Sequence, residues 1–76
     1  MAEPAVVAKL RKIPSLQARS DGDLLLLGYY ACTMTTNGHD GDDVAMTIAY
    51  DATITERDAE FLLKVALPAL CPSVME

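Results

Sequence analysis

Two cysteines, Cys32 and Cys71, constrain the fold of this 76-residue chain more than any other feature. Each lies at the far end of an apolar segment with helical spacing, and Pro72 follows the second directly. A domain of this length is close to the lower limit at which one hydrophobic core suffices. A disulfide between the two cysteines would destabilise the unfolded state by about 4 kcal/mol in the chain-entropy model. We therefore predict a Cys32–Cys71 disulfide and an oxidising compartment. Two buried free thiols in a cytosolic protein are the alternative.

The spacing of the apolar residues predicts four helices, and proline, glycine and capping residues mark their ends. Pro14 ends the first helix, because the residue before a proline is pushed out of the helical region. Gly38 ends the second, since glycine tolerates a positive φ. Thr55 is a good N-cap for the fourth helix, and Pro68 predicts a kink or an end in it. The predicted helices span about residues 4–12, 21–36, 42–51 and 55–70.

Short links between the last three helices predict that these helices alternate in direction. The second and fourth helices would then be parallel, with Cys32 and Cys71 side by side. We therefore predict an all-α fold, a small bundle of three to four helices with one disulfide linking the C-terminal ends of the second and last helices. The chain forms a single domain, 1–76, whose parts are an N-terminal helix and loop (1–20), a disulfide-linked helical core (21–72) and a tail (73–76).

The second predicted helix carries four consecutive leucines, Leu24 to Leu27. At 100° per residue these side chains point to every side, so the helix is either central in the bundle or has one face against another chain. Gly28 lies one turn before Cys32 on the same face, where a missing side chain lets another helix approach closely. The side chains predicted to bind a partner are Leu24, Leu26, Leu27 and Tyr30.

Charge is divided unevenly along the chain. Residues 1–20 hold four basic residues against Glu3 alone, whereas residues 21–76 hold two basic residues against ten carboxylates. A pI of about 4.6 argues against a nucleic-acid-binding protein, which would present a basic surface. The longest uncharged run, 24–38, is too short to span a bilayer. The opening residues resemble a mature N-terminus after removal of a signal peptide, with Met1 added for expression, so we expect a secreted or cell-envelope protein.

Several chemistries are excluded by the residues at hand. A zinc site needs several thiolate or imidazole ligands at close spacing, and the chain has one histidine, His39, and no Cys-x-x-Cys pair. The aspartates Asp40, Asp42 and Asp43 do not fit the ligand spacing of a calcium-binding EF-hand loop, and we interpret them as helix-capping residues. No serine is paired with a nearby base in the sequence pattern. We therefore predict no catalytic site, no metal and no cofactor.

Five short segments give the chain a resemblance to a known family. They are Leu27–Cys32, Asn37–Gly38, Ile54–Thr55, Ala59–Leu62 and Ala66–Pro72. Over about residues 10–73 the chain resembles the short, secreted, helical actinobacterial proteins of the domain-of-unknown-function 732 family. The resemblance implies a small, disulfide-linked α-helical domain exported by actinobacteria or encoded by their phages, and it assigns no catalytic residue. Pro68 departs from the straight last helix that the family implies.

Two functional classes remain. We expect a non-enzymatic, exported interaction or accessory module that binds a protein partner, either a larger cell-envelope or membrane-associated assembly or a second copy of itself. This expectation rests on the apolar excess of the chain, 51% of its residues, and on the leucine run. The alternative is a small carrier of haem or lipid, although a domain of this length has little room for a ligand cavity. Its candidate iron ligands are Tyr29, Tyr30, Tyr50 and His39.

Overall fold

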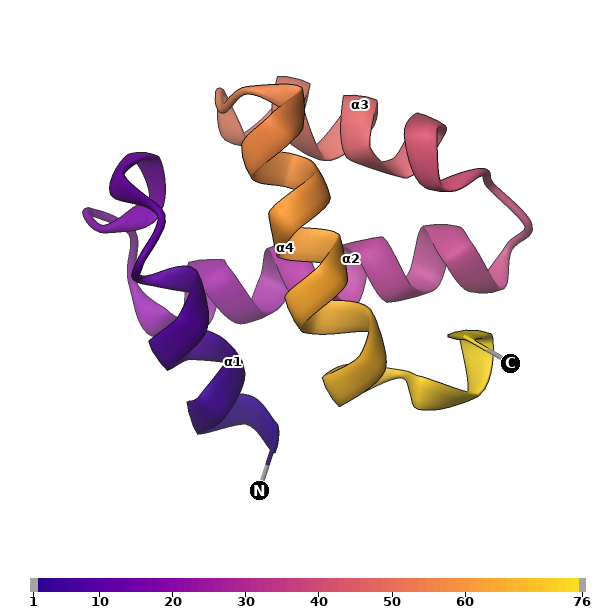
Figure 1. Cartoon of the computed structure of the whole chain (residues 1–76), viewed down its shortest axis with the longest axis horizontal. Coiled ribbons are helices and arrows are strands. Elements are labelled where there is room, and N and C mark those ends of the chain that lie inside the picture. Colours follow the sequence, from indigo (N-terminus) through magenta and orange to yellow (C-terminus); the bar gives the residue numbers. More distant parts are fainter. Residues whose placement is uncertain (1, 76) are drawn as a thin grey trace.

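The computed structural model describes residues 2–75, which contain four α-helices and two short 3-10 helices (Figure 1). These residues contain no β-strand, so the prediction of an all-α fold is confirmed for them. The elements are α1 (Ala2–Leu10), η1 (Pro14–Leu16), α2 (Asp21–Thr36), α3 (Gly41–Ala52), α4 (Glu56–Leu70) and η2 (Pro72–Met75).

The helix starts and stops follow local chemistry. The Ser20 hydroxyl accepts the Asp23 backbone N–H at 3.1 Å at the start of α2, and the Thr55 hydroxyl accepts the Asp58 N–H at 3.1 Å at the start of α4. Each bond satisfies an amide that the first helical turn leaves without a partner. Gly38, with φ of 94°, follows the end of α2. The predicted Thr55 cap and the predicted glycine stop are both confirmed.

The last helix does not end at its proline. α4 continues through Pro68 to Leu70, and the Cys71 N–H then donates to the Leu67 carbonyl at 3.0 Å. Pro68 lies in the last turn and is exposed to solvent. Its missing N–H therefore removes one helical hydrogen bond just before the helix would end anyway.

The predicted alternation of helix directions holds for α2 and α3 but fails for α4. Figure 1 shows α2 and α3 running in opposite directions, whereas α4 crosses α2 instead of lying alongside it. The link between α3 and α4 is only residues 53–55, and it begins with Thr53 in the left-handed region at φ 57°. This tight turn redirects the chain across α2. The C-terminal end of α4 therefore lies beside Cys32, about one turn before the end of α2 at Thr36.

The crossing of α2 and α4 depends on Gly28. A Cβ atom at this position would lie 2.8 Å from the Leu70 Cδ1 atom and 3.4 Å from the Ala66 Cβ atom of α4. The absence of a side chain thus lets the two helices approach closely, as the sequence predicted for this position.

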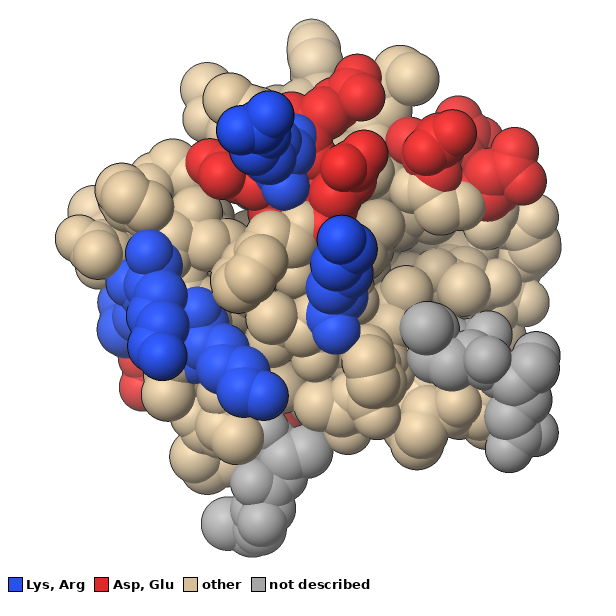
Figure 2. Space-filling model, viewed as in Figure 1, with Lys and Arg blue, Asp and Glu red and all other residues tan. Residues whose placement is uncertain are grey.

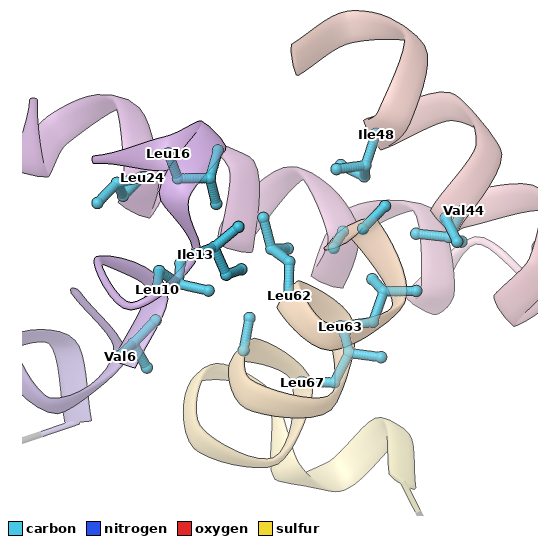
Figure 3. Packing of buried hydrophobic residues seen from close by; sticks show 14 of the residues in the cluster. Val6, Leu10, Ile13, Leu16, Leu24, Val44, Ile48, Leu62, Leu63 and Leu67 are labelled. Atoms are coloured by element: carbon cyan, nitrogen blue, oxygen red, sulfur yellow. The ribbon is translucent and has the colours of Figure 1, made fainter. Parts of the chain in front are cut away.

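One hydrophobic core joins the four α-helices and η1. The N-terminal segment contributes Val6, Leu10, Ile13 and Leu16, all of them buried. Figure 3 shows these side chains directed toward Leu62 of α4. Residues 14–20 belong to the loop that the sequence predicted after the first helix, but they contain the helix η1, whose Leu16 is buried. The N-terminal segment from Val6 to Leu16 therefore packs into the same core as the later helices. The other buried apolar residues with less than 2% exposure are Leu24, Ala31, Val44, Ala45, Ile48, Ala59, Leu62 and Ala66.

Polar contacts fix this N-terminal segment in place. The Arg19 guanidinium donates to the Ala52 carbonyl at 2.6 Å, which satisfies an acceptor at the end of α3. The Ser15 hydroxyl donates to the Asp58 carboxylate at 3.0 Å. Both contacts hold the segment against the turn between α3 and α4.

Candidate functional site

The disulfide is the first feature of the candidate site. Cys32 and Cys71 are bonded, with 6.0 Å between their Cα atoms, so the predicted pair is confirmed. The expected placement at two helix ends is only approximate. Cys71 directly follows α4, but Cys32 lies within α2, four residues before its end at Thr36. Because Gly28 lies one turn earlier on the same face of α2, the bond secures the crossing of α2 and α4.

Helix α2 has two contrasting faces. Its inner face, which we define as Leu24, Gly28, Ala31 and Cys32, is buried in the core. Its outer face, which we define as Leu26, Tyr29, Tyr30 and Thr33, is exposed to solvent. Leu26 retains 68% of its side-chain exposure, and each of the two tyrosines retains 42%. These four residues follow the i, i+3, i+4, i+7 spacing of a single helix face.

The structure separates the four residues that were predicted to bind a partner. Leu26 and Tyr30 lie on the outer face. Leu27 is half-buried and packs against the core. Leu24 is fully buried, because two residues along a helix correspond to a rotation of about 200° away from Leu26. Leu24 therefore belongs to the core and is removed from the candidate surface.

Sequence reasoning omitted Tyr29 from this surface, although its spacing three residues after Leu26 could have revealed it. The Tyr29 hydroxyl donates a hydrogen bond to the Glu3 carboxylate of α1. This hydrogen bond to an anionic acceptor raises the pKa of Tyr29 above its ordinary value, and the negative charge of Glu3 acts in the same direction. The outer face of α2 therefore contacts α1 through this hydrogen bond.

A hollow of about 380 Å³ lies between α1 and the first half of α2. Its apolar lining includes Val7 and Leu25. Arg11 and Asp21, which form an ion pair, also line it. Glu3 also lines this hollow. Because Glu3 accepts a hydrogen bond from Tyr29, the hollow adjoins the outer face of α2.

Acidic side chains gather in one region of the surface. Figure 2, drawn from the same side as Figure 1, shows most of the Asp and Glu side chains near the starts of α3 and α4, and Lys and Arg side chains over both α1 and α4. The acidic residues in those first turns are Asp42, Asp43, Glu56 and Asp58. In these positions carboxylates interact favourably with the positive end of the helix dipole. Helix capping therefore accounts for this acidic region.

The candidate iron ligands of the carrier alternative are spread over the surface. Tyr29 and Tyr30 lie on α2, and Tyr50 lies on α3 with 86% of its side chain exposed. His39 is exposed between α2 and α3, with its Nδ1 atom 3.6 Å from the Asp43 carboxylate. Among the described residues, no three His, Cys, Asp or Glu side chains gather where they could hold a metal ion. Within the same part of the chain, no helix has the length and apolar character needed to cross a membrane.

Comparison with known proteins gives one match. A family model described as "Protein of unknown function (DUF732)" matches residues 5–73, which is most of the chain. No curated protein matches the chain, and neither does any solved structure. Since the family model covers the four-helix core and both cysteines, the chain belongs to the DUF732 family.

Proposed function

We propose that this protein is a non-enzymatic, exported accessory module that binds a protein partner of the cell envelope through the outer face of α2. The observation that carries the proposal is the exposure of Leu26, Tyr29 and Tyr30 on one side of a helix whose other side is fully used by the core. The core leaves these side chains exposed, and the helix presents them together.

The chemistry of the outer face suits a protein interface. Residues 24–38 contain no charged side chain, although 22% of the whole chain is charged. The centres of protein interfaces are depleted of charge and enriched in tyrosine. Tyrosine also supplies many of the side chains whose truncation weakens binding most. The outer face combines both features.

Export is supported by the disulfide, because disulfides persist in oxidising compartments. The resemblance to secreted actinobacterial proteins points to the same compartment and to the cell envelope as the site of action. The non-enzymatic part of the proposal is supported by the structural roles of the polar side chains. The Ser15 hydroxyl donates a hydrogen bond to the Asp58 carboxylate, and Thr55 caps α4.

The test is site-specific photo-crosslinking in the native host. A photoreactive side chain replaces Leu26 in one variant, and in the control it replaces Met46, which is 55% exposed on α3. We expect one discrete adduct with a larger protein at position 26 and none at position 46. An adduct of twice the mass of the chain would identify a second copy as the partner. The same adducts at both positions, or no adduct at position 26, would contradict the proposal.

A further inference from the structure

The domain has two broad sides, and they differ in chemistry. Its extents are 30 × 28 × 16 Å, and Figures 1 and 2 view it along the shortest of these directions. In this view α4 passes in front of α2, and the Gly28 side of α2 faces α4. Leu26 is two residues from Gly28, a rotation of about 200°, so the outer face of α2 is directed away from α4. The near side therefore presents α1 and α4 instead of that outer face.

Helix α4 turns a mixed basic and apolar stripe toward this near side. Its Ala66 is fully buried and lies against α2 at the crossing. Lys64 and Pro68 are each two residues from Ala66, so they lie about 200° away from it, on the opposite side of the helix, and both are exposed. Phe61, at i−3 from Lys64 and i−7 from Pro68, belongs to the same stripe and keeps 43% of its exposure. The half-buried Val65 borders Phe61 one turn later.

Two more lysines join this stripe from α1. Val7 lines the hollow between α1 and α2, and Lys9, two residues later, is rotated about 200° away from α2. Lys12 follows three residues after Lys9, and its N–H donates to the Lys9 carbonyl, which continues the helical turn. Both lysines are exposed, and Figure 2 shows basic side chains over α1 and α4 on this one side. We define the lysine face as Lys9, Lys12, Phe61, Lys64, Val65 and Pro68.

The lysine face is locally positive, although the net charge of the chain is −5. Its three lysines are not within ion-pair distance of any described carboxylate. Glu3 is bonded to α2, and Asp21 is paired with Arg11. The carboxylates in the first turn of α4 lie at least six residues, or about 9 Å, before Lys64, and physiological salt screens charge beyond about 8 Å. Glu60, one turn before Lys64, is the carboxylate that flanks the face.

The residue types favour an anionic lipid surface over an acidic protein. Arginine is the residue best suited to a fixed carboxylate, because it binds bidentately. The arginines next to the face are used within the chain: Arg11 pairs with Asp21, and Arg19 donates to the Ala52 carbonyl. Lysine is a point charge on a flexible stem, which suits mobile lipid head groups. An exposed aromatic ring among lysines is typical of surfaces that lie at the boundary of head groups and acyl chains.

We propose that the lysine face adsorbs to the surface of an anionic lipid bilayer, with Phe61 at the level of the head groups and the lysines on lipid phosphates. A flat bilayer can contact a broad side of the domain without a matching cavity. The outer face of α2 is then directed away from the bilayer and is free to bind a protein. This role goes beyond the proposed protein partner, and either one can fail without the other.

The test places a fluorescent probe on each broad side of the disulfide-bonded chain, which has no tryptophan of its own. Phe61→Trp reports on the lysine face, and the matched Tyr30→Trp reports on the outer face of α2. Each variant is titrated with vesicles of phosphatidylcholine that contain or lack phosphatidylglycerol. We expect a blue shift of the Phe61→Trp emission with the anionic vesicles, little change with the neutral ones, and no shift for Tyr30→Trp. Vesicle binding should weaken as the salt concentration rises.

Vesicle co-sedimentation of lysine variants measures the contribution of charge. Each of Lys9→Gln, Lys12→Gln and Lys64→Gln should weaken binding to the anionic vesicles about fivefold, the scale of one basic residue at such a surface. Tyr30→Ala should leave it unchanged. Equal binding to both kinds of vesicle, a blue shift at position 30 alone, or unchanged binding in the triple lysine variant would overturn the proposal. Tighter binding of a soluble oligoglutamate peptide, or of the free head group glycerophosphoglycerol, would also overturn it.

Discussion

The two faces of α2 carry apolar residues of similar type but have opposite roles. The inner face contains Leu24, fully buried, and Gly28, where α4 crosses within side-chain contact distance. The outer face contains Leu26 and two tyrosines, which remain exposed. One side of the helix therefore holds the fold together, and the other is available to bind a partner.

The difference shows that hydrophobicity alone does not identify core residues. Leu24 and Leu26 are chemically identical and two positions apart, yet one loses all of its exposure and the other keeps two-thirds. What distinguishes them is which side of α2 faces the core, and Gly28 and Cys32 mark that side. Three predictions, ordered by the size of the expected effect, test this contrast between the faces, and a comparison of two glutamate substitutions tests it most directly.

Of these three, the largest effect is expected from the disulfide on the inner face. Cys32 and Cys71 are 39 residues apart in sequence, and releasing a loop of this length costs about 4 kcal/mol in the chain-entropy model. Cys32→Ala with Cys71→Ala should lower the free energy of unfolding by about 2–5 kcal/mol, the range for small exported domains. Urea unfolding measures the loss. Stability within about 0.5 kcal/mol of the native chain would show that close packing alone holds the crossing.

A smaller effect is expected at the crossing itself. Gly28→Val adds a branched side chain where even a Cβ would lie 2.8 Å from Leu70, so α2 and α4 must separate or repack. Overpacking of this kind costs about 1–3 kcal/mol. The matched control is Gly22→Val, in the first turn of the same helix, where the nearest atom is 3.9 Å away. Thermal unfolding should show a lower midpoint for Gly28→Val than for the native chain, and an unchanged midpoint for Gly22→Val. Equal stability of the two variants would argue against a close crossing of α2 and α4.

The smallest effect is expected on the outer face, from the hydrogen bond between Tyr29 and Glu3. Glu3→Gln removes the anionic acceptor, so the pKa of Tyr29 should fall toward its ordinary value. A raised pKa in the folded state means that the bond adds stability at neutral pH, and this contribution is lost as pH rises through the folded-state pKa. NMR titration of the tyrosine ring carbons measures the shift. Glu60→Gln, on α4, is the control, and an unmoved Tyr29 pKa in Glu3→Gln would mean that the bond is absent in solution.

Much of the local structure could be predicted from the sequence, because local signals act over a few residues. Thr55 as an N-cap, Gly38 as a helix stop and Gly28 as a site of close approach were all recognised from residue type and spacing. The Cys32–Cys71 pair followed from the small size of the domain and the positions of the cysteines.

The direction of α4 and the extent of the outer face could not be predicted in this way. The direction depends on the left-handed conformation of Thr53, which residue type argues against, and an alternating bundle was therefore the natural expectation. The same turn brings Ser15 next to Asp58 and forms a hollow beside Tyr50. Both depend on residues far apart in the sequence, so no local pattern could indicate them. The burial of Leu24 likewise depends on where other helices pack.

The most direct test of the account compares Leu24→Glu with Leu26→Glu in the isolated, disulfide-bonded domain. A carboxylate at position 24 would be buried without a partner and should reduce stability by several kcal/mol or unfold the domain. At position 26 it would be solvated, and the free energy of unfolding should stay within about 0.5 kcal/mol of the native value. Urea unfolding of the two variants measures these free energies and shows whether both faces, or the inner face alone, belong to the core. If Leu26→Glu is as destabilising as Leu24→Glu, the outer face is part of the core and is not available to a partner.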